Sequence, residues 1–175
     1  MDSIQTSFFT TPFGELLLGS FGKELCLCDW RHRKRRSFID ERIQSGLRSG
    51  YVEGESDMIQ EAKAQLREYF SGDRQEFDLP LLLVGSEFQK QVWKELAQIP
   101  FGKTVSYAGL ADKLGNKEAI RAVASANGAN AISIIVPCHR VLGSDGSLTG
   151  YAGGLSIKKK LLQLEHALPQ GELPL

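Results

Sequence analysis

The chain has 175 residues, and its 42% hydrophobic and 24% charged content is typical of a soluble folded protein and excludes wholesale disorder. Its 21 basic residues equal its 21 acidic ones, so bulk charge does not favour coating of a nucleic acid. No apolar run approaches the roughly 20 residues that span a bilayer, and no signal peptide is evident. Because three cysteines argue against a disulfide framework, we expect a cytoplasmic protein without a membrane segment.

The zero net charge conceals a division of the chain near residue 85. Residues 1–85 carry three more acidic than basic side chains, and residues 86–175 carry three more basic than acidic ones. We therefore predict two domains, 1–85 and 86–175, of which the second would face a polyanion more readily.

The first half has the pattern of a small α/β domain. Three strand-like runs lie at residues 4–10, 16–21 and 24–30, with a Pro12-Phe13-Gly14 turn signal between the first two. Apolar residues spaced by threes and fours predict a helix over 56–70, which Ser71 and Gly72 close. The Leu-rich residues 78–84 suit either a final strand or a linker.

The second half is predicted to be mainly helical. Residues 87–98 place their apolar side chains on one helical face, and Pro100 and Gly102 follow. Ser106 can cap a short helix that stops at Gly115, and an alanine-rich helix is predicted from 117 to 126. A short helix, a turn containing glycine and a second helix suggest a helix-turn-helix.

The residues around Cys138 carry the chemistry. The β-branched run 132–136 predicts a strand that drives inward, and Pro137 then ends regular hydrogen bonding where Cys138 is presented. A nucleophilic cysteine needs a nearby base or positive charge, and His139 and Arg140 follow at once. A single cysteine after an apolar run is usually a buried, inert residue, so these positions alone slightly favour the inert interpretation.

The sequence beyond Pro137 reverses that judgement. Pro137-Cys138-His139-Arg140-Val141 resembles the active-site signature of the methylated-DNA–protein-cysteine methyltransferases, also called O6-alkylguanine-DNA alkyltransferases. The substrate-binding loop and closing helix of that family are matched at residues 146–155, Lys158, Leu161, Leu162 and Glu165. The resemblance is strong over 101–165, whereas the first half matches only in general pattern. It implies a small ribonuclease-H-like α/β domain followed by a mainly helical, winged helix-turn-helix-like domain.

The resemblance also implies roles for single residues. Cys138 would take the alkyl group from O6 of guanine, His139 would draw off its proton through a water, and Glu165 would orient His139. Asn130 would brace the turn before the active site, and Tyr107 would donate to N3 of the guanine. The guanine pocket would be formed by Tyr151 and by backbone groups of Cys138, Val141 and Ala152.

Double-stranded DNA that carries O6-alkylguanine is the implied partner. A stacked guanine cannot reach a buried cysteine, so the nucleotide would rotate out of the duplex and Arg121 would fill the vacated stack. The alanines of the second helix suit close approach to the minor groove, although packing against the first helix would equally explain some of them. Asn116 and Ser144 match positions that contact phosphates.

The implied enzyme is a methylated-DNA–[protein]-cysteine S-methyltransferase that is consumed in a single turnover. The thioether product has no carbonyl for water to attack, and whether O4-alkylthymine is also accepted stays open. We predict a monomer without a cofactor. A lesion-sensing protein without transfer is the alternative, and the presence of Cys138 counts against it. A cysteine hydrolase would need an oxyanion hole for which the sequence gives no indication.

Three further features of the sequence have competing interpretations. Cys26, Cys28 and His32 offer three potential zinc ligands, but small apolar strand residues are the preferred reading and we predict no metal. The basic run 31–36 would suit phosphate, although a solvated surface turn is favoured. The family usually has Asn-Pro where this chain has Asn130 followed by alanine, so we expect looser local structure without loss of chemistry.

Overall fold

Residues 4–30 form an antiparallel meander in the computed structural model, which describes residues 2–168 of the chain. Its strands are β1 (Ile4–Thr11), β2 (Gly14–Phe21) and β3 (Glu24–Trp30), so the three predicted strands are confirmed. The Thr11 hydroxyl accepts from the amides of Phe13 and Gly14 at 3.1 Å and closes the first turn. Gly22 closes the second turn with a φ of 60°, a conformation that costs glycine little.

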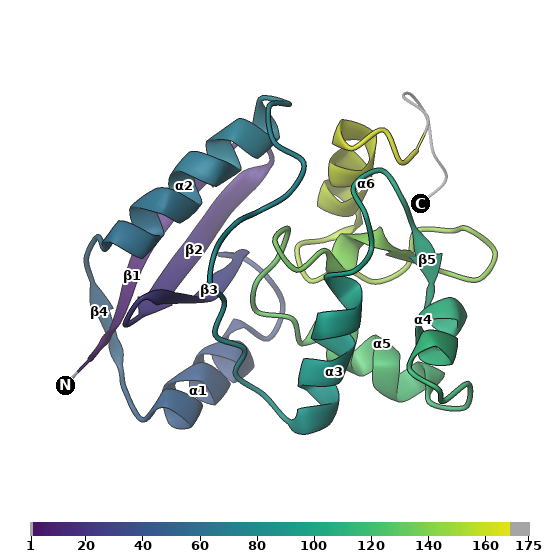
Figure 1. Cartoon of the computed structure of the whole chain (residues 1–175), viewed down its shortest axis with the longest axis horizontal. Coiled ribbons are helices and arrows are strands. Elements are labelled where there is room, and N and C mark those ends of the chain that lie inside the picture. The colour runs from purple at the N-terminus through teal and green to yellow at the C-terminus, as the bar shows by residue number, and fades with distance from the viewer. Residues whose placement is uncertain (1, 169–175) are drawn as a thin grey trace. The chain divides into compact units, whose positions relative to one another are not determined.

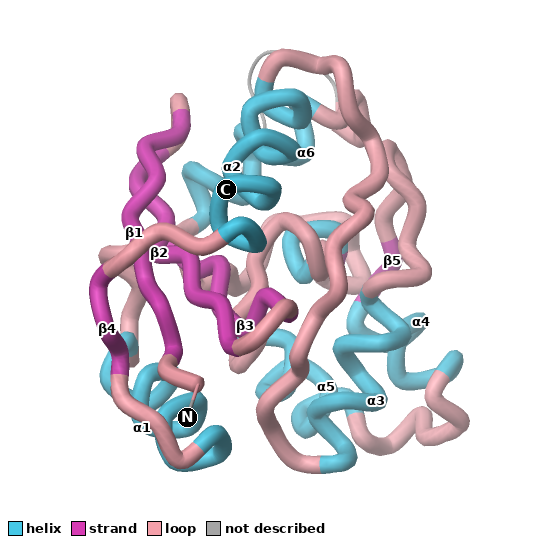
Figure 2. The backbone as a smooth tube through the Cα atoms, turned by 60° about the vertical axis from the view of Figure 1, so that its left-hand side comes forward, coloured by secondary structure: helices cyan, strands magenta, loops and turns pink. Residues whose placement is uncertain are grey.

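A fourth strand and two helices complete the first of two compact units, Met1–Gly85. β4 (Tyr51–Glu53) pairs with β1 in parallel, which gives the sheet order β3-β2-β1-β4 (Figures 1 and 2). α1 (Arg36–Leu47) begins inside the basic run and buries only Ile39 and Ile43. Neither β4 nor α1 was predicted from the sequence, because a three-residue strand and a helix with so few buried apolar residues leave little periodic signal.

The second helix of this unit follows its sequence pattern closely. α2 (Asp57–Phe70) starts after Ser56, whose hydroxyl accepts from the Ile59 amide at 3.1 Å, and Ser71 is its C-cap. Its buried face, which contains Ile59, Ala62, Leu66 and Tyr69, packs against β1, β2 and β3. Residues 78–84 form a linker with one isolated bridge, in which Leu25 donates to Pro80 and accepts from Leu82, both at 2.9 Å.

The second unit, Ser86–Leu175, is built mainly from helices. They are α3 (Glu87–Leu96), α4 (Tyr107–Lys113), α5 (Ile120–Gly128) and α6 (Leu155–Leu164), as Figure 1 shows. The short strands β5 (Val105–Ser106) and β6 (Val141–Leu142) pair in parallel. Ser106 caps α4 by accepting from the Gly109 amide at 2.9 Å, as the sequence predicts. The α3 side chain Trp93 donates through Nε1 to the Ala126 carbonyl at 2.8 Å, which ties α3 to α5.

Two local predictions in this unit are wrong. The alanine-rich helix begins at Ile120 rather than at residue 117, because residues 117 and 118 form a turn. Residues 132–136 form a buried turn rather than a strand, with Val136 donating to Ile132 at 2.9 Å and Ile134 held at a φ of 73°. A β-branched residue in that left-handed region is strained, so the surrounding core must impose it.

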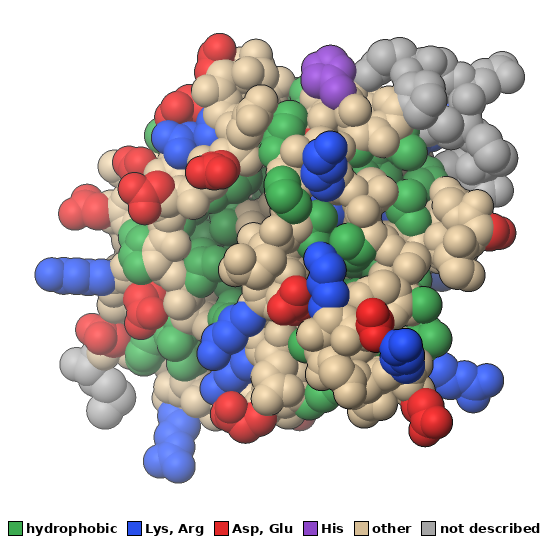
Figure 3. Space-filling view, turned by 45° about the vertical axis from the view of Figure 1, so that its right-hand side comes forward, with side chains coloured by type: hydrophobic (Ala, Val, Ile, Leu, Met, Phe, Trp, Pro, Cys, Tyr) green, Lys and Arg blue, Asp and Glu red, His purple; other side chains and the backbone are tan. Residues whose placement is uncertain are grey.

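The surface carries charges of both signs. On the face drawn in Figure 3, Lys and Arg side chains lie among Asp and Glu side chains rather than in one continuous basic field. Among residues 2–168, no helix is both long and apolar enough to cross a membrane.

Candidate active site

Cys138 is the first residue of a short 3-10 helix, η1 (Cys138–Arg140), that follows Pro137. Its side chain is 3% exposed, and its amide donates to the Val136 carbonyl at 2.8 Å. The strained turn described above therefore leads directly into the cysteine and fixes its backbone.

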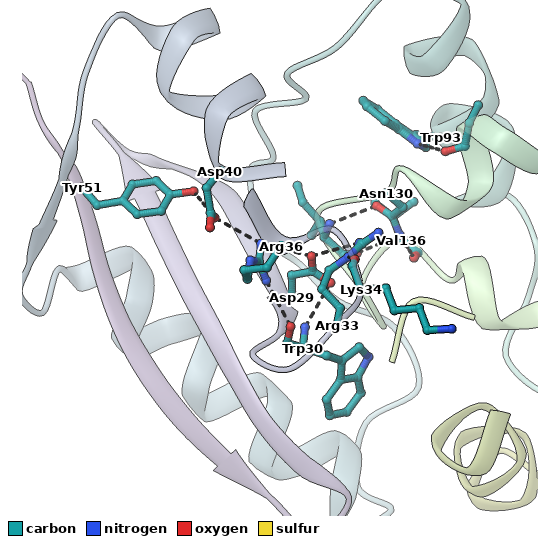
Figure 4. A network of polar contacts seen from close by, with 12 residues as sticks. Asp29, Trp30, Arg33, Lys34, Arg36, Asp40, Tyr51, Trp93, Asn130 and Val136 are labelled. Carbon is teal, nitrogen blue, oxygen red and sulfur yellow. Dashed lines mark hydrogen bonds and ion pairs between the residues drawn. The ribbon is translucent and has the colours of Figure 1, made fainter. Parts of the chain in front are cut away.

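Asn130 holds this turn from inside. Its Nδ2 donates to the Val136 carbonyl at 2.8 Å and to the Ile132 carbonyl at 3.4 Å, and its Oδ1 accepts from the Ile132 amide at 3.0 Å (Figure 4). The residue is 2% exposed, and without its Oδ1 the buried Ile132 amide would lose a hydrogen bond, whereas the two carbonyls also accept from the Cys138 and Val136 amides. The turn is thus bound by the asparagine itself, next to the position where Ala131 replaces the usual proline.

His139 and Glu165 form a fully buried pair at the same place. His139 Nε2 lies 2.8 Å from Glu165 Oε2, and both side chains are 0% exposed. Burial, followed by the nearby Arg140 and Lys158 charges, lowers the pKa of His139 despite the opposing carboxylate, so the ring is neutral at neutral pH. Because the carboxylate accepts from Nε2, the basic nitrogen is Nδ1, which is buried and has no hydrogen-bond partner among residues 2–168.

Arg140 clamps the same carboxylate from the other side. Its Nε and Nη2 donate to the two Glu165 oxygens at 2.8 and 2.9 Å, and its Nη1 donates to the Ile99 carbonyl at 2.6 Å. Burial tends to raise the pKa of Glu165, but the contacts with His139 and Arg140 outweigh it and lower that pKa to about 2. Glu165 is therefore ionised. From the sequence, Arg140 was expected only as a positive charge near Cys138, and its clamp on Glu165 was not predicted.

Lys158, on α6, binds the loop that follows the cysteine. Its ammonium is fully buried and donates to the carbonyls of Val141, Thr149 and Gly150 at 2.5, 3.0 and 3.1 Å. Burial lowers the pKa of Lys158 to about 8, although the Cys138 thiolate charge acts in the opposite direction. Lys158 matches the closing helix of the family in sequence, but its role in fixing β6 and the loop together was not predicted.

Tyr107 faces this loop from the start of α4. Its hydroxyl donates to the Thr149 carbonyl at 3.2 Å, and its ring centre lies 5.9 Å from Lys158 Nζ. The other predicted pocket residues lie along the same segment. Val141 is buried in β6, whereas Tyr151 and Ala152 are half-buried in the loop before α6. The Tyr151 ring lies edge-on to His139, with 6.5 Å between ring centres.

The three predicted DNA-contact residues lie on the surface of the same unit. Arg121 is an exposed residue in the first turn of α5, and Asn116 is exposed in the turn between α4 and α5. Ser144 is exposed in the loop after β6. All three side chains are exposed, whereas Cys138, His139 and Glu165 are buried.

Some side chains of the basic run 31–36 form ion pairs within the first unit. Arg33 and Arg36 bind Asp29, which is fully buried, at 3.1 and 3.2 Å. Arg36 also lies 3.3 Å from Asp40, whose carboxylate accepts from the Tyr51 hydroxyl at 2.7 Å (Figure 4). Part of the run therefore joins α1 to the sheet instead of facing solvent.

Cys26 and Cys28 are buried in β3. Burial raises the pKa of Cys26 to about 12 and that of Cys28 further, so both thiols are protonated. A bulge between Gly19 and Ser20 leaves Cys26 outside the strand register. Among residues 2–168, no three His, Cys, Asp or Glu side chains gather as a metal site would need.

Comparisons with known proteins find relatives of both units. The family model for the 6-O-methylguanine DNA methyltransferase DNA binding domain matches residues 87–167, and the model for its ribonuclease-like domain matches residues 4–83. The chain is 42% identical over 159 residues to a methylated-DNA–protein-cysteine methyltransferase of Methanosarcina acetivorans, covering 91% of this chain and 96% of that protein. It is similar to Mycobacterium tuberculosis OGT, crystallised in complex with DNA, with 40% identity, a TM-score of 0.79, and coverage of 93% and 92% of the two chains.

Proposed function

The chain belongs to the methylated-DNA–protein-cysteine methyltransferase family, and on this premise we propose that it repairs duplex DNA by moving the alkyl group of O6-alkylguanine to Cys138. One observation carries the proposal: Cys138 is followed directly along the chain by His139 and Arg140, and both of these bind the buried Glu165 carboxylate. This network leaves one basic ring nitrogen, His139 Nδ1, for proton transfer. The presence of Cys138 favours alkyl transfer over lesion sensing without transfer.

The reaction begins with removal of the Cys138 proton. Glu165 fixes the His139 tautomer with its proton on Nε2, so Nδ1 takes the thiol proton through a water molecule. The thiolate sulfur then attacks the alkyl carbon. The sulfur–carbon bond forms as the carbon–O6 bond breaks, and the bonding electrons pass to the guanine. Tyr107 donates its hydroxyl proton to N3 of the departing base, and the proton held by His139 restores the tyrosine.

The alkylated protein is the end product. A thioether offers water no carbonyl to attack, so Cys138 is consumed once for each lesion. The chain is therefore a stoichiometric acceptor, and the proposal requires no metal and no cofactor.

The DNA must present its damaged base outside the stack, because Cys138 is 3% exposed. Arg121 on α5 would occupy the vacated position, where its planar cation can stack and pair with the orphaned base. Asn116 and Ser144 would contact phosphates, and Tyr151, Val141 and Ala152 would line the guanine pocket. We place this activity in the cytoplasm and expect a monomer to carry it.

Mass spectrometry of the Cys138 peptide tests the proposal directly. The protein is incubated with a duplex that contains one O6-methylguanine, and the digest is weighed. We expect one added methyl group on Cys138 in proportion to repaired base, with the Cys26–Cys28 peptide of the same digest as an unmodified internal control. Cys138→Ser should abolish transfer and leave DNA binding largely intact. Tight lesion binding with unmodified Cys138 would instead indicate the lesion-sensing alternative.

The role of Arg121 needs a substrate that does not require base extrusion. Arg121→Ala should slow repair of duplex DNA more than reaction with free O6-benzylguanine. Lys117→Ala is the matched control, because Lys117 is a nearby cation whose side chain is 81% exposed. Equal loss of Arg121→Ala activity on both substrates would contradict the role in extrusion.

A further inference from the structure

The helix α5 carries Arg121, the residue proposed above to fill the vacated stack, but its own sequence does little to fix it in place. Its two caps, Ala119 and Ala129, are alanines, whose side chains cannot bind the free backbone groups at the helix ends. The helix has nine residues, and Val123 is the largest apolar side chain that it buries. A short helix without side-chain caps is marginal by itself, so contacts with the rest of the second unit must set its position.

Trp93 on α3 provides such a contact near the C-terminal end of α5. The residue is 2% exposed, and its indole Nε1 donates to the Ala126 carbonyl at 2.8 Å (Figure 4). One residue further along α5, the Asn127 Nδ2 lies 3.5 Å from the carbonyl oxygen of Cys138. The C-terminal part of α5 is therefore joined both to α3 and to the backbone of the proposed nucleophile.

Arg121 lies at the opposite end of the same helix. It precedes Ala126 by five residues, which is about 7.5 Å along the helix axis, and its side chain is exposed. A small rotation of α5 about its anchored end is enlarged at the tip of this long side chain. The Trp93 hydrogen bond resists that rotation, because the rigid indole ring fixes the direction of its N–H and the bond weakens steeply when it bends.

Building on the proposed function, we infer that Trp93 is a positioning residue for base extrusion, whose indole N–H holds α5 at the angle at which Arg121 enters the vacated stack. Trp93 is buried and acts only through α5, and no bond to it is made or broken. The effect belongs to the step in which the damaged base leaves the duplex. A free base leaves no gap to fill, so its reaction with Cys138 does not depend on this angle.

Trp93→Phe tests this role, because phenylalanine keeps a buried ring and removes the N–H donor. The loss of one typical hydrogen bond corresponds to about a fivefold change, so single-turnover transfer from an O6-methylguanine duplex at saturating protein should slow about fivefold. The rate with free O6-benzylguanine should change less than about twofold, which also shows that the variant is folded. Trp93→Met, a second variant without the donor, should show the same difference between the two substrates.

Tyr51→Phe is the matched control. It also removes a hydrogen-bond donor from a partly buried aromatic side chain, in this case the hydroxyl that donates to Asp40 at 2.7 Å within the first unit. Both of its rates should stay within about twofold of wild type, because this hydrogen bond does not hold α5.

A second background separates the positioning of Arg121 from a general loss of stability. In Arg121→Ala there is no long side chain to position, so adding Trp93→Phe should change the remaining duplex rate less than about twofold. A loss that persists undiminished in that background would overturn the inference, as would equal losses on duplex and free base or a wild-type duplex rate in Trp93→Phe. If wild-type protein leaves Cys138 unmodified with both substrates, the proposed function itself fails, which is a different result.

Discussion

Replacing Glu165 with glutamine would break a buried ion pair while keeping the shape of the side chain. The carboxylate accepts from His139 once and from Arg140 twice, all within 2.9 Å. Glu165→Gln leaves the Arg140 side chain, which is 7% exposed, opposite a neutral amide. Removing one member of a buried pair costs about 3–5 kcal/mol, because an uncompensated charge remains. We expect a loss of that size in the free energy of unfolding, measured in urea at pH 7.

A double-mutant cycle tests the origin of this loss. Arg140→Met should cost a similar amount, since it leaves the Glu165 carboxylate with His139 alone. The double variant removes both charges together, so its loss should be smaller than the sum of the single losses by about 2 kcal/mol. Glu87→Gln, whose side chain is 90% exposed, is the matched control and should stay within about 0.5 kcal/mol of wild type.

Additive losses would refute this reasoning. If the double variant equals the sum of the single variants to within about 0.5 kcal/mol, the carboxylate and the guanidinium do not stabilise each other. The same variants also bear on the chemistry. Glu165→Gln should slow alkyl transfer to Cys138 because a neutral amide oxygen stabilises the protonated His139 ring less than a carboxylate does, which weakens the basicity of Nδ1.

Three further measurements follow from the structure. Since burial lowers the pKa of His139 below 6.5, the folded state binds a proton on this ring less readily than the unfolded state does. The free energy of unfolding, measured in urea, should therefore fall as the pH drops below 6.5, by up to about 1.4 kcal/mol per pH unit. His139→Gln should lack this contribution to the pH dependence. Lys158→Met removes the ammonium that donates to the buried Val141 carbonyl and to the carbonyls of Thr149 and Gly150, so thermal melting should show a loss of about 2–4 kcal/mol together with slower transfer. Asn130→Ala should cost about 2–4 kcal/mol in urea unfolding, whereas Asn116→Ala, at an exposed position, should cost less than about 0.5.

Local signals in the sequence predicted much of the fold. The three strands of the first unit follow alternation and turn residues, and α2 and α4 begin after Ser56 and Ser106 as their caps indicate. These features depend on neighbours within a few residues, which is why the sequence reveals them. β4 and α1 were missed because their stability comes from pairing with β1 and from a few buried contacts rather than from a periodic pattern.

The buried turn at residues 132–136 shows where local propensity fails. Its β-branched residues favour a strand. The Asn130 side chain nevertheless forms hydrogen bonds with the Val136 carbonyl and the Ile132 amide, and the core holds Ile134 at a positive φ. Tertiary contacts therefore override propensity at the segment that presents Cys138.

The sequence by itself determined the family and the adjacency of Cys138, His139 and Arg140, because these lie in one uninterrupted motif. The family resemblance implied that Glu165 orients His139, but only the tertiary structure showed that Arg140 binds the same carboxylate. Glu165 lies 26 residues from His139, yet its carboxylate fixes that ring and binds Arg140 in the same network. The Lys158 clamp on the loop depends likewise on packing between distant segments, and spacing along a chain does not encode which side chains meet in a dry interior.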